Sequence, residues 1–379
     1  MMDGTEKILD TFAASVRDPF NRLKEYKARV GKKAIGYFLT DFPEELIHAA
    51  SMIPIAVLGN NENISLADAY FQNFACSLVR STLESKLNHT LDILDGMVIP
   101  HICDTTQCLA SIWKIAFPGG YFDELVFPKK RHTPSARTYL LNELSRFKKG
   151  LEEYAGVKIT DESLWDSIRL YNNHRELLRK LYAFKRDHPQ ALHEREFFTI
   201  IRASMLMAKE EHSQLLSQMM TGLAERTTKP EKKVRLVVSG MVCEPLQVLD
   251  LIDELGGAIV NDDLCTGSRY FLEDIELNHN PLEAIVDRQL KKNPFPGYHI
   301  VSDEAGDSLL DMVEKTDAHG VIFLHLKFCE VHNFDYPDLK KRLEERKIPH
   351  LLLETELQMT SLEQLRTRLQ AFIEILGRR

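Results

Sequence analysis

The chain has 379 residues, of which 44% are hydrophobic and 27% are charged. This length exceeds what one hydrophobic core usually supports, so we expect two domains, with or without a helical insert. No apolar stretch approaches the roughly 20 residues of a membrane-spanning helix. Residues 1–26 carry acidic side chains early and lack the apolar core of a secretory signal. We therefore expect a cytoplasmic protein with no membrane partner.

The balance of charge and the use of cysteine narrow the function further. Lys and Arg number 48 against 56 Asp and Glu, a formal net charge of −8, and no basic block is present that could follow a phosphate backbone. Nucleic acid is therefore not an expected partner. The cysteines are few and scattered, which does not suit a disulfide framework and leaves free thiols or metal ligands. They are Cys76, Cys103, Cys108, Cys243, Cys265 and Cys329.

Two stretches predict the same local fold. Residues 32–62 indicate a strand, a turn, a helix opened by Pro43, and a second strand, and residues 232–263 repeat this order with Pro245 near the helix start. Later, GMVIPHIC at 96–103 resembles GVIFLHLKFC at 320–329, so that a strand runs toward a cysteine in both halves. This pattern predicts parallel sheets and an internal duplication, although strand–helix–strand units have similar apolar patterns in general.

The middle of the chain has the apolar spacing of helices. We expect helices over 138–156, 161–187 and 194–227, with Asp161 as a cap and Pro189 as a separator. The sequence leaves two roles possible for this insert: structural packing, or closure over a pocket at the cleft between the two domains. TTKPEKK at 227–233 is the clearest linker. The expected fold class is α/β, with two flavodoxin- or Rossmann-like parallel-sheet domains at 1–134 and 231–379 and the helical region at 135–230.

Because the sequence lacks the common nucleotide-binding, hydrolase and zinc-binding motifs, the cysteines are its remaining candidates for a reactive or metal-binding site. The sequence has no GxGxxG after a strand, no phosphate-binding GxxxxGK[ST] loop, no GxSxG, no HExxH and no CxxC. Cys76 is predicted near a helix start, where the helix dipole favours a thiolate. Cys103 and Cys329 are predicted after strands, and three such thiolates could hold an iron–sulfur cluster. From the residues alone, ordinary packing of buried cysteines is the favoured interpretation, and the cluster is the alternative.

Several ordered blocks resemble the benzoyl-CoA reductase and 2-hydroxyacyl-CoA dehydratase family. They are YFQNFACSLVRSTLE at 70–84, DILDGMVIPHICDTTQCLASIWKIAFPGGY at 92–121, NDDLCTGSRYF at 261–271 and LKFCEVHNFDYP at 326–337. In this family, two related subunits of α/β domains and helices pair and carry low-potential iron–sulfur clusters. The resemblance implies that Cys76, Cys103 and Cys329 hold a 4Fe–4S cluster in this chain.

The same resemblance implies a reaction and partners. The WKIAFPGGY stretch and the chain length are similar to the smaller, cluster-bearing subunit of ATP-dependent benzoyl-CoA reductase, an oxidoreductase that dearomatises benzoyl-CoA by two electrons to a cyclohexadienoyl-CoA. The implied partners are a homologous larger subunit, ATP-hydrolysing activator subunits, and a ferredoxin as electron source. The alternatives are a subunit of a 2-hydroxyacyl-CoA dehydratase, which is a lyase, and a non-catalytic electron relay beside the larger subunit.

The remaining cysteines match no ligand position of the family. We expect Cys243 and Cys265 to be structural, and we expect Cys108 to face helix packing. Some members of the family hold a larger double-cubane cluster, and in that case one of these three cysteines could be recruited.

Other polar residues near the cysteines have both a functional and a structural interpretation. His101 on the side of Cys103, and His325 with Lys327 on the side of Cys329, could supply protons or bind a cluster sulfide, although histidines in apolar strands are usually core residues. We expect Asp104 to cap a helix.

Two arginines could bind CoA phosphates. For Arg80 and Arg269 we expect buried salt bridges instead.

Overall fold

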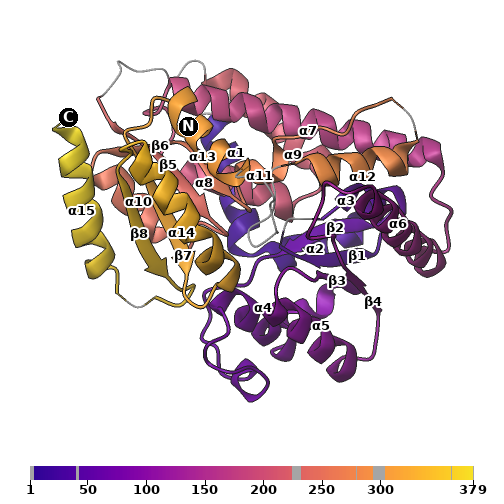
Figure 1. Cartoon of the computed structure of the whole chain (residues 1–379). Coiled ribbons are helices and arrows are strands. Elements are labelled where there is room, and N and C mark those ends of the chain that lie inside the picture. The colour runs from indigo at the N-terminus through magenta and orange to yellow at the C-terminus, as the bar shows by residue number, and fades with distance from the viewer. Residues whose placement is uncertain are drawn as a thin grey trace.

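The fold consists of two parallel sheets joined by a helical region, as seen in a computed structural model (Figure 1). The structure describes residues 4–39, 42–223, 232–278, 280–292, 304–359 and 361–378. Over these ranges, every helix is either too short or too polar to cross a lipid bilayer. In Figure 1 the first sheet lies on the right, the second sheet lies on the left, and α7 (Asp161–Asp187) runs along the top of both.

The first sheet has the strand order β2-β1-β3-β4, with parallel neighbours throughout. Its strands are β1 (Ala34–Phe38), β2 (Ile53–Val57), β3 (Gly96–Pro100) and β4 (Tyr121–Leu125). The first three are buried along their whole length, as expected for parallel strands covered by helices. Their connections contain α3 (Glu44–Ala49), η1 (Ala67–Ala69), α4 (Ser77–Leu87), η2 (Thr90–Ile93) and α5 (Asp104–Ala116).

The second sheet repeats this topology with the order β6-β5-β7-β8, again parallel. Its strands are β5 (Val234–Gly240), β6 (Gly257–Leu264), β7 (Gly320–Leu326) and β8 (His350–Thr355). The helices of this half are α10 (Gln247–Glu254), α11 (Ser268–Phe271), α12 (Pro281–Lys291), α13 (Glu304–Lys315), α14 (Glu330–Glu345) and α15 (Glu363–Gly377). The predicted α/β class with two parallel-sheet units is confirmed, and β3 and β7 hold equivalent places in the two sheets.

The helical region differs from the prediction in one element. Besides α6 (Pro134–Ala155) and α7, a single helix was expected over 194–227, but the chain forms α8 (Glu194–Leu206) and α9 (Lys209–Leu223). Met207 between them is extended, and the buried ammonium of Lys209 donates to the Ser204 carbonyl at 2.5 Å. Helix α8 therefore ends at Leu206, and Lys209, the first residue of α9, bonds back to a carbonyl of its last turn. Residues 224–231, with most of the expected linker at 227–233, lie outside the described ranges.

The helical region connects the two halves. The Ser167 hydroxyl of α7 donates to the Glu45 carbonyl at 3.0 Å, and near the end of the same helix the Tyr182 hydroxyl donates to Asp262 at 2.5 Å. The cap of α7 is Thr160, and Asp161, which was expected in that role, is the first helical residue. The insert thus has at least the packing role, and the boundaries at 134 and 230 stay a prediction.

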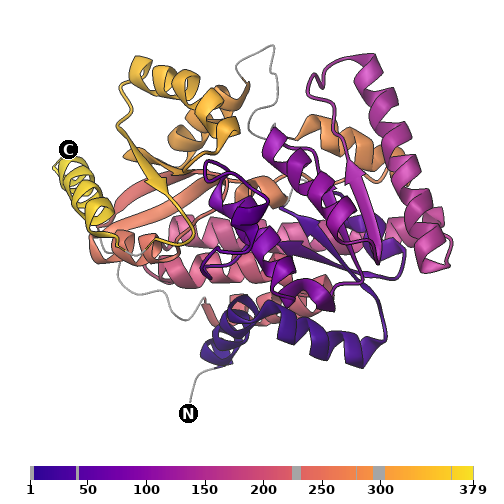
Figure 2. The same cartoon turned by 90° about the horizontal axis from the view of Figure 1, so that it is seen from below.

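Two N-terminal helices, which the sequence reasoning did not predict, complete the architecture. They are α1 (Gly4–Arg17) and α2 (Pro19–Val30). Helix α1 packs against α8 and α9 of the helical region, and Figure 2 shows it beside these helices, away from β3 and β4. Phe12 on its inner face is fully buried and contacts the ring of His212 at 4.8 Å between centroids.

A buried polar cluster fixes the two halves against each other. The Glu44 carboxylate accepts hydrogen bonds from the hydroxyls of Tyr37 at 2.7 Å and Tyr270 at 2.6 Å, and it pairs with Lys209 at 2.9 Å. Tyr37 belongs to the first sheet, Tyr270 to α11 of the second half, and Lys209 to α9. Because the Glu44 and Lys209 side chains are each only 2% exposed, this pair depends on the docking of all three parts.

Candidate metal centre

The carboxyl ends of the two sheets face a common cleft, and three cysteines line it. Cys76 and Cys103 come from the first half, and Cys329 comes from the second. The first half also contributes Phe38 and Leu39 from the end of β1, and the second half contributes Met241 after β5 and Phe328 after β7. Ligands of open parallel sheets bind at this end of the strands, where the strand order reverses. The two sheets thus direct equivalent edges toward one site.

Each of the three cysteines is the N-cap residue of a helix. Cys76 precedes α4, Cys103 precedes α5 and Cys329 precedes α14. In each case, the backbone N–H of the third helical residue stabilises the thiolate form of the sulfur, and these residues are Val79, Thr106 and His332. Three positive helix ends therefore converge on one cleft, which favours anionic groups there.

Burial opposes the ionisation of these thiols. It raises the pKa of Cys76 to about 11, and it also raises the pKa values of Cys103 and Cys329. Mutual repulsion contributes, because a charge on Cys103 raises the pKa of Cys76 and charges on both raise that of Cys329. The three sulfurs therefore lie close enough to interact. A bound cation would reverse this balance and stabilise the thiolates.

Thr106 holds the turn that presents Cys103. Its hydroxyl accepts from the N–H groups of Ile102 and Cys103, both at 3.0 Å, and donates to the Cys103 carbonyl at 2.8 Å. Thr106 is 2% exposed, so these hydrogen bonds are shielded from water. Such a reciprocal cap fixes the entry of the chain into the helix.

Two carboxyl groups meet at the rim of the cleft. Asp104 follows Cys103, Glu330 follows Cys329, and both side chains are exposed. A hydrogen bond with Asp104 raises the pKa of Glu330, and partial burial and the nearby negative charge of Asp104 act in the same direction. Asp104 also accepts from the N–H of Thr105 at 2.9 Å, although the cap itself is Cys103 rather than Asp104.

The histidines and the lysine proposed near the site do not line the cleft. His101 shares a hydrogen bond of 2.6 Å with Glu124 of β4. His325 is buried and stacks on His332 with 4.9 Å between ring centroids, and burial lowers its pKa to about 4. His325 is therefore neutral near pH 7. Lys327 is half exposed and pairs with Glu356 at 3.1 Å.

The two arginines form salt bridges, but only that of Arg269 is buried, as was expected for both. Arg269 pairs with Asp263 at 2.7 Å, and both side chains are at most 10% exposed. Arg80 pairs with Asp68, whose side chain is half exposed. Neither arginine lines the cleft.

The other cysteines lie apart from the three in the cleft. Cys243 and Cys265 are buried, and the Cys265 sulfur is 3.6 Å from that of Met241. Cys108 is exposed, so the expectation that it faces helix packing is wrong. It lies four residues after Asp104 on α5, on the solvent side of an amphipathic helix that buries Leu109, Ala110 and Trp113.

The donor set suits a cluster better than a single ion. Among the described residues, no group of three His, Cys, Asp or Glu side chains is placed to hold one metal ion. A 4Fe–4S cluster distributes its cysteine ligands over several iron atoms, so its ligands lie farther apart than those of one ion. Three cysteines on three helix N-termini around a shared cleft fit that requirement. The space now between the side chains is about 20 Å³, so the thiols would have to move apart to admit a cluster.

Sequence reasoning missed the supporting residues of this site. The resemblance singled out the three cysteines, but it did not identify the Thr106 cap, the contact of Asp104 with Glu330, or Met241 in the wall. The order Cys-Asp-Thr-Thr could have indicated the cap, because a threonine three residues after a cap residue is able to bond back to it. No sequence signal connects Asp104 with Glu330, which are far apart in the chain.

Comparisons with known proteins identify the family of the chain. The model of the family "2-hydroxyglutaryl-CoA dehydratase, D-component" matches residues 39–376. The chain is 31% identical to the (R)-phenyllactyl-CoA dehydratase beta subunit of Clostridium sporogenes and 30% identical to the lactoyl-CoA dehydratase beta subunit of Anaerotignum propionicum, over 99% of this chain and 100% of each relative. It is 30% identical to a benzoyl-CoA reductase subunit of Thauera aromatica, over 88% of both chains. The chain therefore belongs to the 2-hydroxyglutaryl-CoA dehydratase D-component family, which includes dehydratase beta subunits and a benzoyl-CoA reductase subunit.

Proposed function

We propose that this chain is the iron–sulfur subunit of a heteromeric enzyme that acts on a CoA thioester, with a 4Fe–4S cluster held by Cys76, Cys103 and Cys329. The observation that carries the proposal is the convergence of these three cysteines, from two sheets and three helix N-termini, on one cleft. No sequence-local motif explains why three cysteines so far apart in the chain meet there. Cys108, Cys243 and Cys265 stay outside the proposed ligand set, and a double-cubane cluster would need one of them.

A cluster with three cysteine ligands supplies single electrons at low potential and has one iron open to another ligand. The residues of this chain would prepare the site for it. The N–H groups of Val79, Thr106 and His332 stabilise the thiolates. Met241 and Phe328 contribute apolar wall that limits access of water. We propose His101 and His325 as proton donors, and a shift of the surrounding wall would be needed to bring either to the cleft.

Two reactions are candidates. The first is the two-electron dearomatisation of benzoyl-CoA, which the sequence resemblance implies. The second is the radical elimination of water from a 2-hydroxyacyl-CoA, and the coverage favours it, because the match extends over the full length of two dehydratase beta subunits but over 88% of the reductase subunit. The proposed partners are a homologous larger subunit, ATP-hydrolysing activator subunits and a ferredoxin.

Iron analysis of single variants tests the ligand set. The full chain is purified anaerobically, alone and with its partner subunit, and iron, acid-labile sulfide and EPR spectra are measured. We expect about four irons and four sulfides per chain, lost in Cys76→Ala, Cys103→Ala and Cys329→Ala and retained in the matched control Cys108→Ala. Wild-type protein without iron, or equal loss in all four variants, would contradict the proposal.

A second experiment separates the reactions and the relay alternative. The complete complex is supplied with reductant and ATP and then given either benzoyl-CoA or an (R)-2-hydroxyacyl-CoA. Formation of a cyclohexadienoyl-CoA identifies the reductase, and formation of an enoyl-CoA identifies the dehydratase. A Cys103→Ala complex that has lost the cluster of this chain but keeps full turnover would show that this cluster has no catalytic role.

A further inference from the structure

A short segment of the second half reaches across to the first half beside the cysteine cleft. It consists of residues 356–358, which follow the end of β8, and is called the strap below. The backbone N–H of Leu357 donates to the Ser77 hydroxyl at 3.2 Å. Because Ser77 follows Cys76 in the chain, the strap contacts α4 at the residue next to a candidate ligand.

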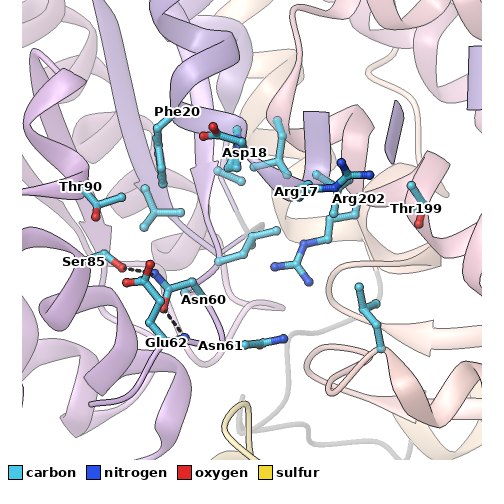
Figure 3. Close-up of a pocket in the computed structure, with 18 of the residues that line it drawn as sticks. Arg17, Asp18, Phe20, Asn60, Asn61, Glu62, Ser85, Thr90, Thr199 and Arg202 are labelled. Atoms are coloured by element: carbon cyan, nitrogen blue, oxygen red, sulfur yellow. Dashed lines mark hydrogen bonds between the residues drawn. The ribbon is translucent and has the colours of Figure 1, made fainter. Parts of the chain in front are cut away.

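The second contact of the strap with the first half is made by Gln358. Its side-chain amide donates to the Asn60 carbonyl at 3.0 Å. Asn60 is itself fixed on α4, because its backbone N–H donates to the Ser81 hydroxyl at 2.8 Å and its side-chain amide donates to Ser85 at 3.1 Å. Figure 3 shows the Asn60 side chain beside Ser85 and Glu62. The group that accepts from Gln358 is therefore a fixed part of the first half.

An apolar contact accompanies these hydrogen bonds. The Leu357 side chain is 2% exposed and belongs to the main hydrophobic core. It packs so closely on Gly59 that a methyl group added to this glycine would lie 3.1 Å from a Leu357 methyl carbon. Gly59 also has a positive φ of 68°, which favours glycine. Leu357 therefore anchors the strap in the interior of the protein.

The strap is also tied to the cysteine of its own half. The backbone N–H of Lys327, directly after β7, donates to the Thr355 carbonyl at 2.9 Å. The Lys327 ammonium pairs with the Glu356 carboxylate at 3.1 Å. Lys327 lies two residues before Cys329. The strap thus begins beside the turn that presents Cys329 to the cleft.

A series of contacts therefore joins Cys76 to Cys329 through the strap. The two cysteines come from opposite halves, and the space between the side chains that line the cleft is about 20 Å³. A motion that carries Cys76 away from Cys329 must break the hydrogen bonds that Leu357 and Gln358 make to the first half. The free energy of such a local opening depends on the contacts that the open state lacks.

We propose that the strap is a latch that controls the opening of the cysteine cleft. With the latch closed, Cys76 and Cys329 are 9% and 7% exposed, and release of the strap makes their sulfurs accessible. The latch rests on the contacts between the halves, whereas its use in admitting a cluster rests on the proposed function. Release of the strap would then precede insertion of the cluster, because the thiols have to move apart to admit it.

Alkylation of the iron-free full chain tests the latch. Iodoacetamide is added to the folded chain, samples are quenched over time, and mass spectrometry gives the rate at each cysteine. In Gln358→Ala we expect Cys76 and Cys329 to react about two- to tenfold faster than in the wild type, the factor by which one hydrogen bond changes an opening equilibrium. The matched control Gln370→Ala, which removes an exposed glutamine that pairs with Glu374 on α15, should leave both rates unchanged.

Cys243 distinguishes local opening from a general loss of stability. Its side chain is 5% exposed and lies outside the cleft, so its rate should be the same in the wild type and in Gln358→Ala. A second variant, Leu357→Ala, removes the buried anchor of the strap. It should accelerate the reaction of Cys76 and Cys329 more than Gln358→Ala does, because a truncated core leucine costs more than one hydrogen bond.

Two results would overturn the inference: wild-type rates at Cys76 and Cys329 in Gln358→Ala, or an equal acceleration at Cys243. Because alkylation is measured without iron, the latch and the proposed function can fail separately. Faster alkylation in a chain that never takes up iron would sustain the latch and reject the cluster. Unchanged alkylation in a chain that does take up iron would reject the latch and sustain the cluster.

Discussion

Replacing Glu44 by glutamine tests whether a buried ion pair holds the two halves of the chain together. Glu44 pairs with Lys209 at 2.9 Å, and both side chains are 2% exposed. In Glu44→Gln the amide oxygen can still accept from Tyr37 and Tyr270, so the main loss is the negative charge beside a buried ammonium. Breaking a buried pair in this way costs about 3–5 kcal/mol, because the remaining charge is left uncompensated.

This loss is large relative to the net stability of a folded protein, which is about 5–15 kcal/mol. The double variant Glu44→Gln, Lys209→Met removes both charges, so we expect it to be more stable than Glu44→Gln alone. Since Cys329 belongs to a different half from Cys76 and Cys103, weaker docking should also lower the iron content of the chain.

Urea unfolding followed by far-UV circular dichroism measures the free energy of unfolding of each variant. The values are compared using the same slope of free energy against urea concentration. The matched control is Glu314→Gln, which breaks a pair with Arg346 whose side chains are 60% and 62% exposed. An exposed pair of this kind contributes about 0–1 kcal/mol. The reasoning is refuted if Glu44→Gln loses no more than the control, or if the double variant is no more stable than Glu44→Gln.

Three further outcomes follow from the structure. Burial raises the pKa of Asp262 from 3.8 to about 6, so the wild type loses stability as this group ionises between about pH 4 and pH 6. Asp262→Asn carries no such proton, so its stability relative to the wild type should increase over that range and be constant above it. Parallel urea titrations that show no such trend would contradict this. In Gly240→Ala the new methyl group collides with the Leu324 carbonyl of the neighbouring strand, so we expect the free energy of unfolding to fall by about 1–3 kcal/mol. Thermal or urea unfolding measures this change. The control Gly119→Ala, which has open space around the new methyl group, should change little. Iodoacetamide should modify Cys108 first in the native chain, since it is the exposed cysteine; mass spectrometry that finds a buried cysteine alkylated earlier would contradict the burial described here.

The sheet strands were predictable because their sequences are short apolar runs between turn residues. VRLVVSG at 234–240 and GVIFLHL at 320–326 are buried on both faces, so nearly every residue is apolar and the run is visible without knowledge of its neighbours. The topological repeat was predictable for the same reason, since both halves carry the same order of strands and helices. The break at Met207 was not predicted, because the apolar periodicity continues through it, and the buried pair of Lys209 with Glu44 beside the break joins residues far apart in the chain.

The sequence by itself determined the α/β class, the two similar halves, and, through a resemblance, the three candidate ligands Cys76, Cys103 and Cys329. Only the tertiary structure decided that these cysteines meet, that each caps a helix, and that Asp104 contacts Glu330 across the cleft. The reason is physical: apolar periodicity is written in neighbouring residues, whereas a site between two sheets depends on how the halves dock, and docking is set by contacts between residues far apart in the chain.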